Sequence, residues 1–146
     1  MTVKTTIKDV TDAIARRSEA SRRTYLDRLD KARAQGVYRS ALSCGNLAHG
    51  FAACGPSDKA QLAGDQALNL GIITSYNDML SAHQPYETYP AIIREAAREA
   101  GGVAHVAGGV PAMCDGVTQG QLGMDLSLFS RDVIAMAAAV GLSHNM

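Results

Sequence analysis

The sequence has no apolar run that approaches the ~20 residues needed to span a bilayer. The stretch from Met1 to Asp12 is mixed polar and lacks the apolar core of a signal peptide. Three cysteines, Cys44, Cys54 and Cys114, are an odd number and too few for a disulfide scaffold. These absences predict a cytoplasmic protein whose cysteines are thiols, either buried or acting as ligands.

The sequence also lacks net charge, because fourteen basic residues balance fourteen acidic ones. It therefore has no overall field to attract nucleic acid or an anionic membrane, and an anionic substrate must be held by a local site. Eight basic residues lie between positions 16 and 39: Arg16, Arg17, Arg22, Arg23, Arg28, Lys31, Arg33 and Arg39. Their acidic neighbours Glu19, Asp27 and Asp30 favour a solvated helix face over a nucleic-acid patch.

The composition is that of an ordinary soluble globular domain, with 47% hydrophobic and 19% charged residues in 146. Apolar and small-residue patterns predict the following elements: helices at 10–35, 58–69, 91–100 and 126–140, and strands at 70–75 and 103–107. The last helix is very apolar, so we expect it to be buried. The segment from Tyr38 to Cys54 is dominated by small residues and predicts no defined element.

Strands that alternate with helices predict an α/β fold with a parallel sheet and flanking helices. We expect a helical segment at 1–36 and an incomplete α/β domain at 37–146. In such sheets ligands bind at the carboxyl ends of the strands. Two polar loops occupy that place in the chain, 75–83 and 108–123.

The loop at 108–123 holds five glycines, which allow the backbone to approach a ligand closely. In it, Cys114 and Asp115 place a soft thiolate beside a hard carboxylate, which suit iron–sulfur clusters and magnesium respectively. Spacing alone favours a tight turn with a buried cysteine and a capping aspartate. The loop lacks the Gly-Lys-Ser/Thr of a Walker A motif and is not a clean GxGxxG.

The loop at 75–83 gathers a hydroxyl, an amide, a carboxylate and an imidazole on Ser75, Asn77, Asp78 and His83. His83 could be a base, a ligand or a substrate contact, although a histidine in a loop is more often only solvated. Earlier in the chain, nine residues separate Cys44 from Cys54. That spacing is not the CxxC of a zinc or ferredoxin site, so it favours packed small residues.

Three strings carry a family resemblance: CGNLAHGFAACGPSDK (44–59), ITSYNDMLSAHQPYETYP (73–90) and AGGVPAMCDGVTQGQLGMDLSLFSRDVIAMAAAVGLSHNM (107–146). They resemble the phosphogluconate branch of the dihydroxy-acid dehydratase family. That resemblance implies a hydro-lyase that converts 6-phospho-D-gluconate to 2-keto-3-deoxy-6-phosphogluconate in the Entner–Doudoroff route. It also implies a 4Fe–4S cluster acting as a Lewis acid, a Mg²⁺ or Mn²⁺ ion, and a homodimer of the full-length enzyme.

The resemblance implies that Asp115 supplies the carboxylate for the divalent metal and that the loop with Ser75, Asn77, Asp78 and His83 contacts the substrate. In the dihydroxy-acid branch this loop also carries a cluster cysteine, but Ala82 stands at its place here. A cluster thiolate from this chain must then come from elsewhere. Cys114, next to Asp115, is the first choice, before Cys44 and Cys54.

The family's next motif, a Cys-Asp-Lys with a cluster thiolate, would follow directly after Met146, and its catalytic base lies in a C-terminal domain. We therefore expect an N-terminal piece of a longer enzyme that does not catalyse alone. Two other functions stay open: dehydration of a non-phosphorylated sugar acid or dihydroxy acid, and a non-catalytic binding or assembly module. The apolar stretch 133–142 argues against a free-standing binding or assembly module, because such a stretch indicates that a large partner surface covers it.

Overall fold

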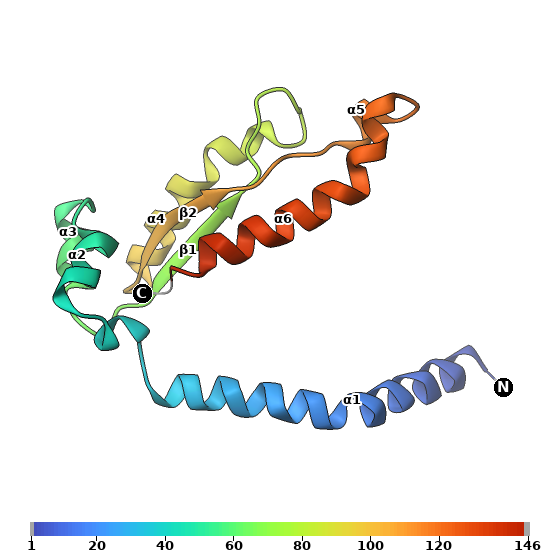
Figure 1. Cartoon of the computed structure of the whole chain (residues 1–146), viewed down its shortest axis with the longest axis horizontal. Helices are drawn as coiled ribbons and strands as arrows, with labels where there is room; N and C mark the ends of the chain where they lie inside the picture. The colour runs from blue at the N-terminus through green and yellow to red at the C-terminus, as the bar shows by residue number, and fades with distance from the viewer. Residues whose placement is uncertain (1, 145–146) are drawn as a thin grey trace. The chain divides into compact units, whose positions relative to one another are not determined.

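A computed structural model of the chain describes residues 2–144 and divides into two units, Met1–Gly36 and Val37–Met146. The first unit is the helix α1 (Val3–Ala34), and none of its residues is buried (Figure 1). Thr2 caps its start by accepting a hydrogen bond from the Thr5 N–H at 3.3 Å, and Gly36 follows its end with φ +74°. The predicted start at Val10 is therefore wrong by two turns.

The second unit is built on a βαβ motif. The strands β1 (Asn69–Thr74) and β2 (Val103–Gly109) pair in parallel, with Asn69 opposite Val103 and an irregularity between Ile72 and Ile73. The helix α4 (Tyr89–Glu99) connects them after the 3-10 helix η2 (Gln84–Glu87). This arrangement confirms the predicted α/β class and parallel sheet.

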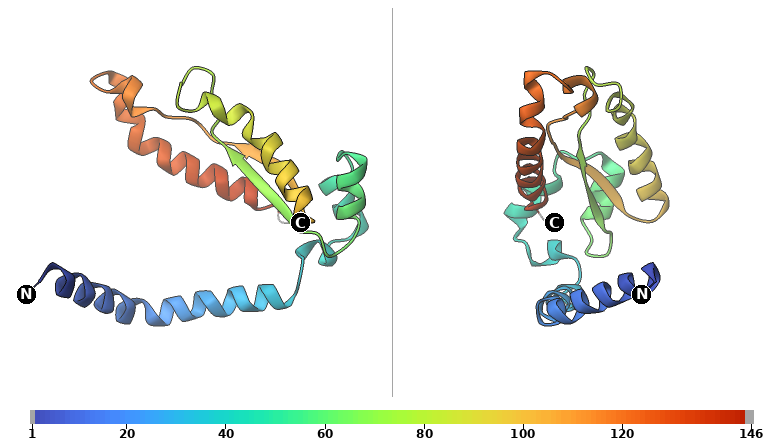
Figure 2. Two further views of the ribbon diagram at one scale, coloured as in Figure 1. Left: turned by 180° about the vertical axis from the view of Figure 1, so that it is seen from behind. Right: turned by 90° about the vertical axis from the view of Figure 1, so that its right-hand side faces the viewer.

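Two helices cover the two faces of this sheet. Figure 2 shows α4 on one side of the strands and α6 (Leu126–Leu142) on the other. Where α6 crosses β1, a Cβ on Gly141 would lie 2.7 Å from the Cδ1 of Ile73, so the absence of a side chain permits the close approach. The buried apolar residues gather around the same strands and are Leu62, Ile72, Val103 and Ala104.

The segment before β1 folds into short helices: the 3-10 helix η1 (Tyr38–Ala41), α2 (Cys44–Phe51) and α3 (Pro56–Leu62). The sequence prediction missed α2, whose N-cap Ser43 accepts a hydrogen bond from the Asn46 N–H. Arg39 in η1 is only 2% exposed and donates to the carbonyls of Gly64 and Ala67 at 2.8–3.0 Å. It thereby joins η1 to the connection between α3 and β1.

After β2 the chain forms α5 (Asp115–Thr118), the 3-10 helix η3 (Leu122–Asp125) and α6. The prediction that α6 is buried is wrong for this structure: Ser127 is its one buried residue, and Leu128 is 70% exposed. The sheet contacts α6 on one side, while Phe129, Met136 and Val140 stay between 61% and 64% exposed. Within the described residues, no helix combines the length and apolar character needed to cross a membrane.

Candidate functional site

The two polar loops predicted to form a site begin next to each other at the carboxyl ends of β1 and β2. The N–H of Val110 donates to the Thr74 carbonyl at 2.9 Å, and this bond links the end of β1 to the residue that follows β2. A cavity of about 200 Å³ opens beside β1 here, and Ser75, Tyr86 and Tyr89 are among its lining residues. The topology thus places the loops where parallel α/β sheets bind their ligands.

Ser75 and His83 are brought together within the first loop. His83 Nδ1 lies 3.0 Å from the Ser75 carbonyl oxygen and 3.1 Å from its Oγ. Because a carbonyl oxygen can only accept, this contact is a hydrogen bond when Nδ1 carries the proton, and in that tautomer Nε2 is the free acceptor. The imidazole and the Tyr86 ring pack in a T-shaped arrangement, with the ring centroids 5.5 Å apart. These contacts within the loop therefore fix the orientation of the His83 ring.

Asn77 and Asp78 make contacts inside the same loop. The Asn77 side-chain oxygen accepts a hydrogen bond from the Met79 N–H at 2.8 Å, which is an Asx-turn. The Tyr76 hydroxyl donates to the Asp78 carboxylate, and this bond raises the pKa of Tyr76 to about 12. The hydroxyl therefore stays protonated at neutral pH and can continue to donate. Of the four predicted substrate contacts, Ser75 and His83 touch each other, while Asn77 and Asp78 shape the turn.

Cys114 and Asp115 stand at the start of α5. Cys114 is the half-buried N-cap residue, and its carbonyl accepts the Val117 N–H at 3.0 Å. Asp115 Oδ1 accepts a hydrogen bond from the Ser127 hydroxyl at 2.8 Å, which joins α5 to the first turn of α6. One oxygen of an exposed carboxylate is thereby held in place.

The donor types of Cys114 and Asp115 fit the predicted cofactors, but their number does not complete a site. Across residues 2–144, no group of three His, Cys, Asp or Glu side chains is arranged to hold a metal ion. A thiolate suits an iron–sulfur cluster and a carboxylate suits a hard cation. This turn can therefore contribute ligands to a shared site and cannot form one by itself.

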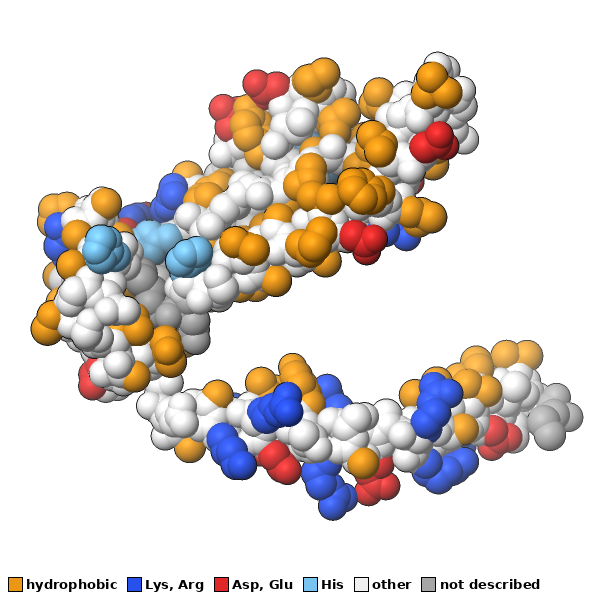
Figure 3. Space-filling model, in the orientation of Figure 1, with side chains coloured by type: hydrophobic (Ala, Val, Ile, Leu, Met, Phe, Trp, Pro, Cys, Tyr) orange, Lys and Arg blue, Asp and Glu red, His pale blue; other side chains and the backbone are white. Residues whose placement is uncertain are grey.

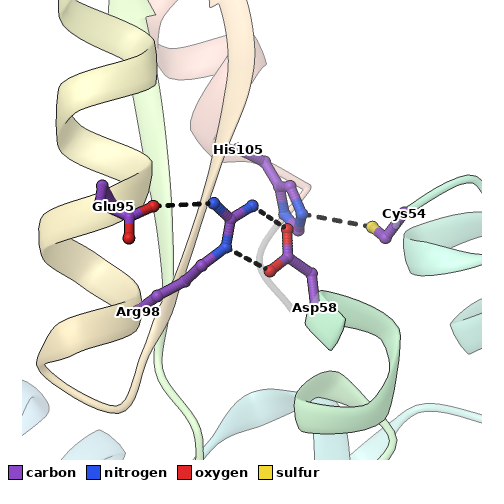
Figure 4. Close-up of polar contacts among 5 residues, drawn as sticks. All are labelled: Cys54, Asp58, Glu95, Arg98 and His105. Atoms are coloured by element: carbon purple, nitrogen blue, oxygen red, sulfur yellow. Dashed lines mark hydrogen bonds and ion pairs between the residues drawn. The ribbon is translucent and has the colours of Figure 1, made fainter. Parts of the chain in front are cut away.

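A second polar cluster joins α3 to β2 and α4, and sequence reasoning missed most of it (Figure 4). Cys54 Sγ lies 3.2 Å from His105 Nε2. Arg98 Nε and Nη2 each donate to one carboxylate oxygen of Asp58 at 2.9 Å, and Glu95 lies 3.5 Å from Arg98 Nη1. The partners are 40 and 51 residues apart in sequence, and no local spacing pattern marks them.

Burial and charge give this cluster a definite protonation state. The hydrogen bonds from Arg98 hold the pKa of Asp58 below its usual range. Burial lowers the pKa of His105, and burial together with the Asp58 charge raises the pKa of the Cys54 thiol. The Cys54–His105 pair is therefore a neutral thiol beside a neutral imidazole at pH 7, and not an activated thiolate.

A second, larger cavity than the one beside Ser75 lies between α2, the start of the strands and the end of α6. It has a volume of about 850 Å³ and is open to solvent. Three of the four histidines in the sequence line it: His49, His105 and His144. Figure 3 shows histidine side chains close together on this face. None of the predicted site residues lies in this cavity.

Comparison with known proteins supplies the family. A family model described as "Dihydroxy-acid/6-phosphogluconate dehydratase N-terminal" matches residues 68–146. The protein named phosphogluconate dehydratase from Rhizobium meliloti (strain 1021) is 69% identical over 146 residues, which cover all of this chain and 24% of that protein. The Escherichia coli (strain K12) protein of the same name is 67% identical over 137 residues, or 94% of this chain and 23% of that protein.

Other comparisons define the limits of this similarity. A protein named dihydroxy-acid dehydratase from Lachnospira eligens is 38% identical over 66 residues, covering 45% of this chain and 12% of that protein. No solved structure matches. The chain thus spans about a quarter of the length of the relatives it matches throughout. Because the family model covers more than half of it, the chain belongs to the dihydroxy-acid/6-phosphogluconate dehydratase family.

Proposed function

We propose that this chain provides the N-terminal part of a phosphogluconate dehydratase, which removes water from 6-phospho-D-gluconate to give 2-keto-3-deoxy-6-phosphogluconate. The observation that carries the proposal is the 69% identity over 146 residues with the Rhizobium meliloti protein of that name. The dihydroxy-acid dehydratase relative is only 38% identical over 66 residues, which favours the phosphorylated substrate. The reaction belongs to the Entner–Doudoroff pathway.

The reaction breaks the C2–H and C3–O bonds of the sugar acid. A base takes the C2 proton, the C3 hydroxyl leaves as water, and the resulting enol becomes the 2-keto acid. Members of this family generally carry an iron–sulfur cluster. When bound, a 4Fe–4S cluster would supply Lewis acidity to the poor C3 leaving group, and Mg²⁺ or Mn²⁺ would neutralise the substrate carboxylate. We expect the base in the C-terminal part of the enzyme.

Cys114 and Asp115 would be ligands at the edge of this centre, with the cluster at the thiolate and the divalent cation at the carboxylate. The Ser127 hydroxyl would orient Asp115, since it holds Oδ1 at 2.8 Å. A fixed carboxylate loses less side-chain freedom when it binds a cation. The remaining ligands would come from the rest of the enzyme, which we expect to be a homodimer.

The loop after β1 would contact the sugar acid. With its proton on Nδ1, where it would donate to the Ser75 carbonyl, His83 would offer Nε2 as an acceptor for a substrate hydroxyl. Ser75 lies beside it, and the Asx-turn at Asn77 sets the path of the backbone. Asp78 is exposed and would be solvated or bind a substrate hydroxyl.

A chimeric enzyme tests the proposal. The 146 residues of this chain replace the matching quarter of the Rhizobium meliloti protein, and formation of 2-keto acid from 6-phosphogluconate is measured anaerobically. We expect turnover within about tenfold of the unmodified relative, since a tenfold loss corresponds to only about 1.4 kcal/mol of barrier. Gluconate and a branched 2,3-dihydroxy acid serve as competing substrates. A folded, cluster-loaded chimera that ignores 6-phosphogluconate or prefers either competitor would refute the assignment.

A further inference from the structure

One edge of β1 pairs with β2, and its opposite edge is open. The Val103 N–H donates to the Leu68 carbonyl at 2.9 Å, just before β1 begins. The Val110 N–H donates to the Thr74 carbonyl at 2.9 Å, at the other end of the strand. Backbone groups alternate in direction along a strand, so the even-numbered residues of β1 point at β2. The odd-numbered residues direct their N–H and C=O groups to the opposite edge: Asn69, Gly71 and Ile73.

This open edge leaves backbone hydrogen bonds unmade. Within residues 2–144 the sheet has two strands, and no described group pairs with the backbone of Asn69, Gly71 or Ile73. The Asn69 Oδ1 atom is also buried, and no described residue donates a hydrogen bond to it. Backbone N–H and C=O groups in folded proteins are nearly always paired, and a neighbouring strand pairs them in register.

The open edge also lacks the features that protect an edge strand. Edge strands commonly carry charged residues, proline or a bulge, which discourage a further strand from pairing. The sequence of β1 is Asn-Leu-Gly-Ile-Ile-Thr, without charge or proline. The irregularity of the pair lies in β2, where Ala107 is the extra residue between the partners of Ile72 and Ile73. The strand β1 therefore has the character of an interior strand with a neighbour on each side.

The positions of the two helices indicate where the next strand lies. The helix α4 connects β1 to β2 across one face of the sheet, and α6 leaves β2 across the other face (Figure 2). Crossover connections between parallel strands are right-handed in about 98% of cases. Because α6 lies on the opposite face from α4, a right-handed crossover through α6 runs in the opposite direction, from β2 back past β1.

The end of α6 lies beside the open edge, in agreement with this direction. A Cβ on Gly71 would lie 3.4 Å from the Cδ2 of Leu142, in the last turn of α6. The cavity of about 850 Å³ reaches the same place, since Asn69, Gly71 and Leu142 are among its lining residues. The chain that leaves α6 therefore has room to turn and enter the sheet next to β1.

We propose that the open edge of β1 binds a parallel β-strand formed by the segment that follows α6 in the longer protein. The matching family model is described as N-terminal, and the chain spans about a quarter of its relatives, so the relatives have chain to form this strand. A segment tethered to the end of α6 reaches a millimolar effective concentration at this edge, which a second copy of the chain lacks. The proposal does not depend on the identity of the substrate.

Hydrogen exchange in the chimeric enzyme tests the pairing, with rates measured for single amides by mass spectrometry. The amides of Leu70 and Ile72 face β2 and serve as internal controls. If a strand pairs with the open edge, Gly71 and Ile73 should exchange within about tenfold of these controls. Alternation by a larger factor, with the odd-numbered amides fast, would overturn the proposal.

Substitution of Gly71 in the chimera gives a matched pair of variants. Gly71→Pro removes an N–H from the open edge and spares the bonds to β2. Gly71→Ala keeps the N–H, and its Cβ would meet Leu142 and Ala107 at 3.4 and 3.5 Å, which is ordinary contact. The Ile73 amide should exchange at least about tenfold faster in the proline variant than in the alanine variant. Equal rates would overturn the proposal, because an open edge tolerates proline.

A density map of the chimera from electron cryomicroscopy identifies the occupant and needs no variant. We expect the strand beside β1 to continue from α6 and to run parallel to β1. A strand from a second copy, an antiparallel strand, a strand from elsewhere in the chain or an empty edge would each overturn the proposal. Neither exchange nor density requires turnover, so failure of the substrate assignment would leave these results unchanged.

Discussion

Replacing Asp115 by Asn distinguishes between two roles of this residue, as a metal ligand and as a structural turn residue. Asparagine keeps an oxygen that can accept the 2.8 Å hydrogen bond from the Ser127 hydroxyl, so the junction between α5 and α6 should survive. We expect a change in unfolding free energy of no more than about 0.5 kcal/mol, as for exposed substitutions that spare their contacts. The lost charge should matter more, because a neutral amide binds a divalent cation more weakly. Activity should fall at least about tenfold.

The assay is dehydration by the chimeric enzyme as a function of Mg²⁺ or Mn²⁺ concentration, with cluster content verified by iron and sulfide analysis. Ser127→Ala provides the comparison, since it removes the hydrogen bond and keeps the carboxylate. It should lower the unfolding free energy by about 1 kcal/mol and activity by less than Asp115→Asn does. Asp125→Asn controls for loss of a nearby exposed charge. Near-normal turnover with unchanged metal dependence in the Asp115→Asn enzyme would show that Asp115 is a structural turn residue.

Three further predictions concern the chain itself. Anaerobic reconstitution of the isolated chain should yield neither dehydratase activity nor a stable 4Fe–4S cluster, and stoichiometric iron and sulfide with the matching visible absorption would contradict this. Because burial lowers the pKa of His105 beneath its ordinary 6.5, His105 is protonated at a higher pH in the unfolded chain than in the folded one. The free energy of unfolding should therefore fall as pH drops below about 6.5. The urea midpoint of the His105→Gln variant should not show this decrease. Arg39→Lys cannot reproduce the forked bonds to Gly64 and Ala67 and should cost about 1–3 kcal/mol, measured as faster amide exchange at the start of β1.

Local sequence signals were sufficient to predict the βαβ motif. The apolar run before Ser75 predicted β1, and Gly101, with φ +79°, ends α4 at the predicted place. The prediction began α1 at residue 10 and missed its true start. Only one residue, the capping Thr2, marks that start in the sequence. The helix α2 was missed because its two glycines disfavour a helix that the Ser43 cap nevertheless starts.

The candidate site was predictable only where it is local in sequence. The loop residues Ser75 and His83 lie eight positions apart, and both follow a predictable strand. The contact between Cys54 and His105 spans 51 residues, and a single sequence contains no signal for such a pair. The predicted burial of α6 failed for a different reason. Apolar composition indicates that a helix needs a partner, but it does not place that partner within the same stretch of chain.

The parallel pairing of β1 and β2 also has a kinetic consequence. Asn69 lies opposite Val103, so the loop closed by this pairing is only 34 residues long, and α4 occupies much of it. Closing such a loop costs about 3 kcal/mol of chain entropy, which burial of the apolar strands can offset. We expect this motif to fold during synthesis, as soon as β2 leaves the ribosome. Amides of β1 should then already resist exchange in a ribosome-stalled chain, and full exchange there would contradict early folding.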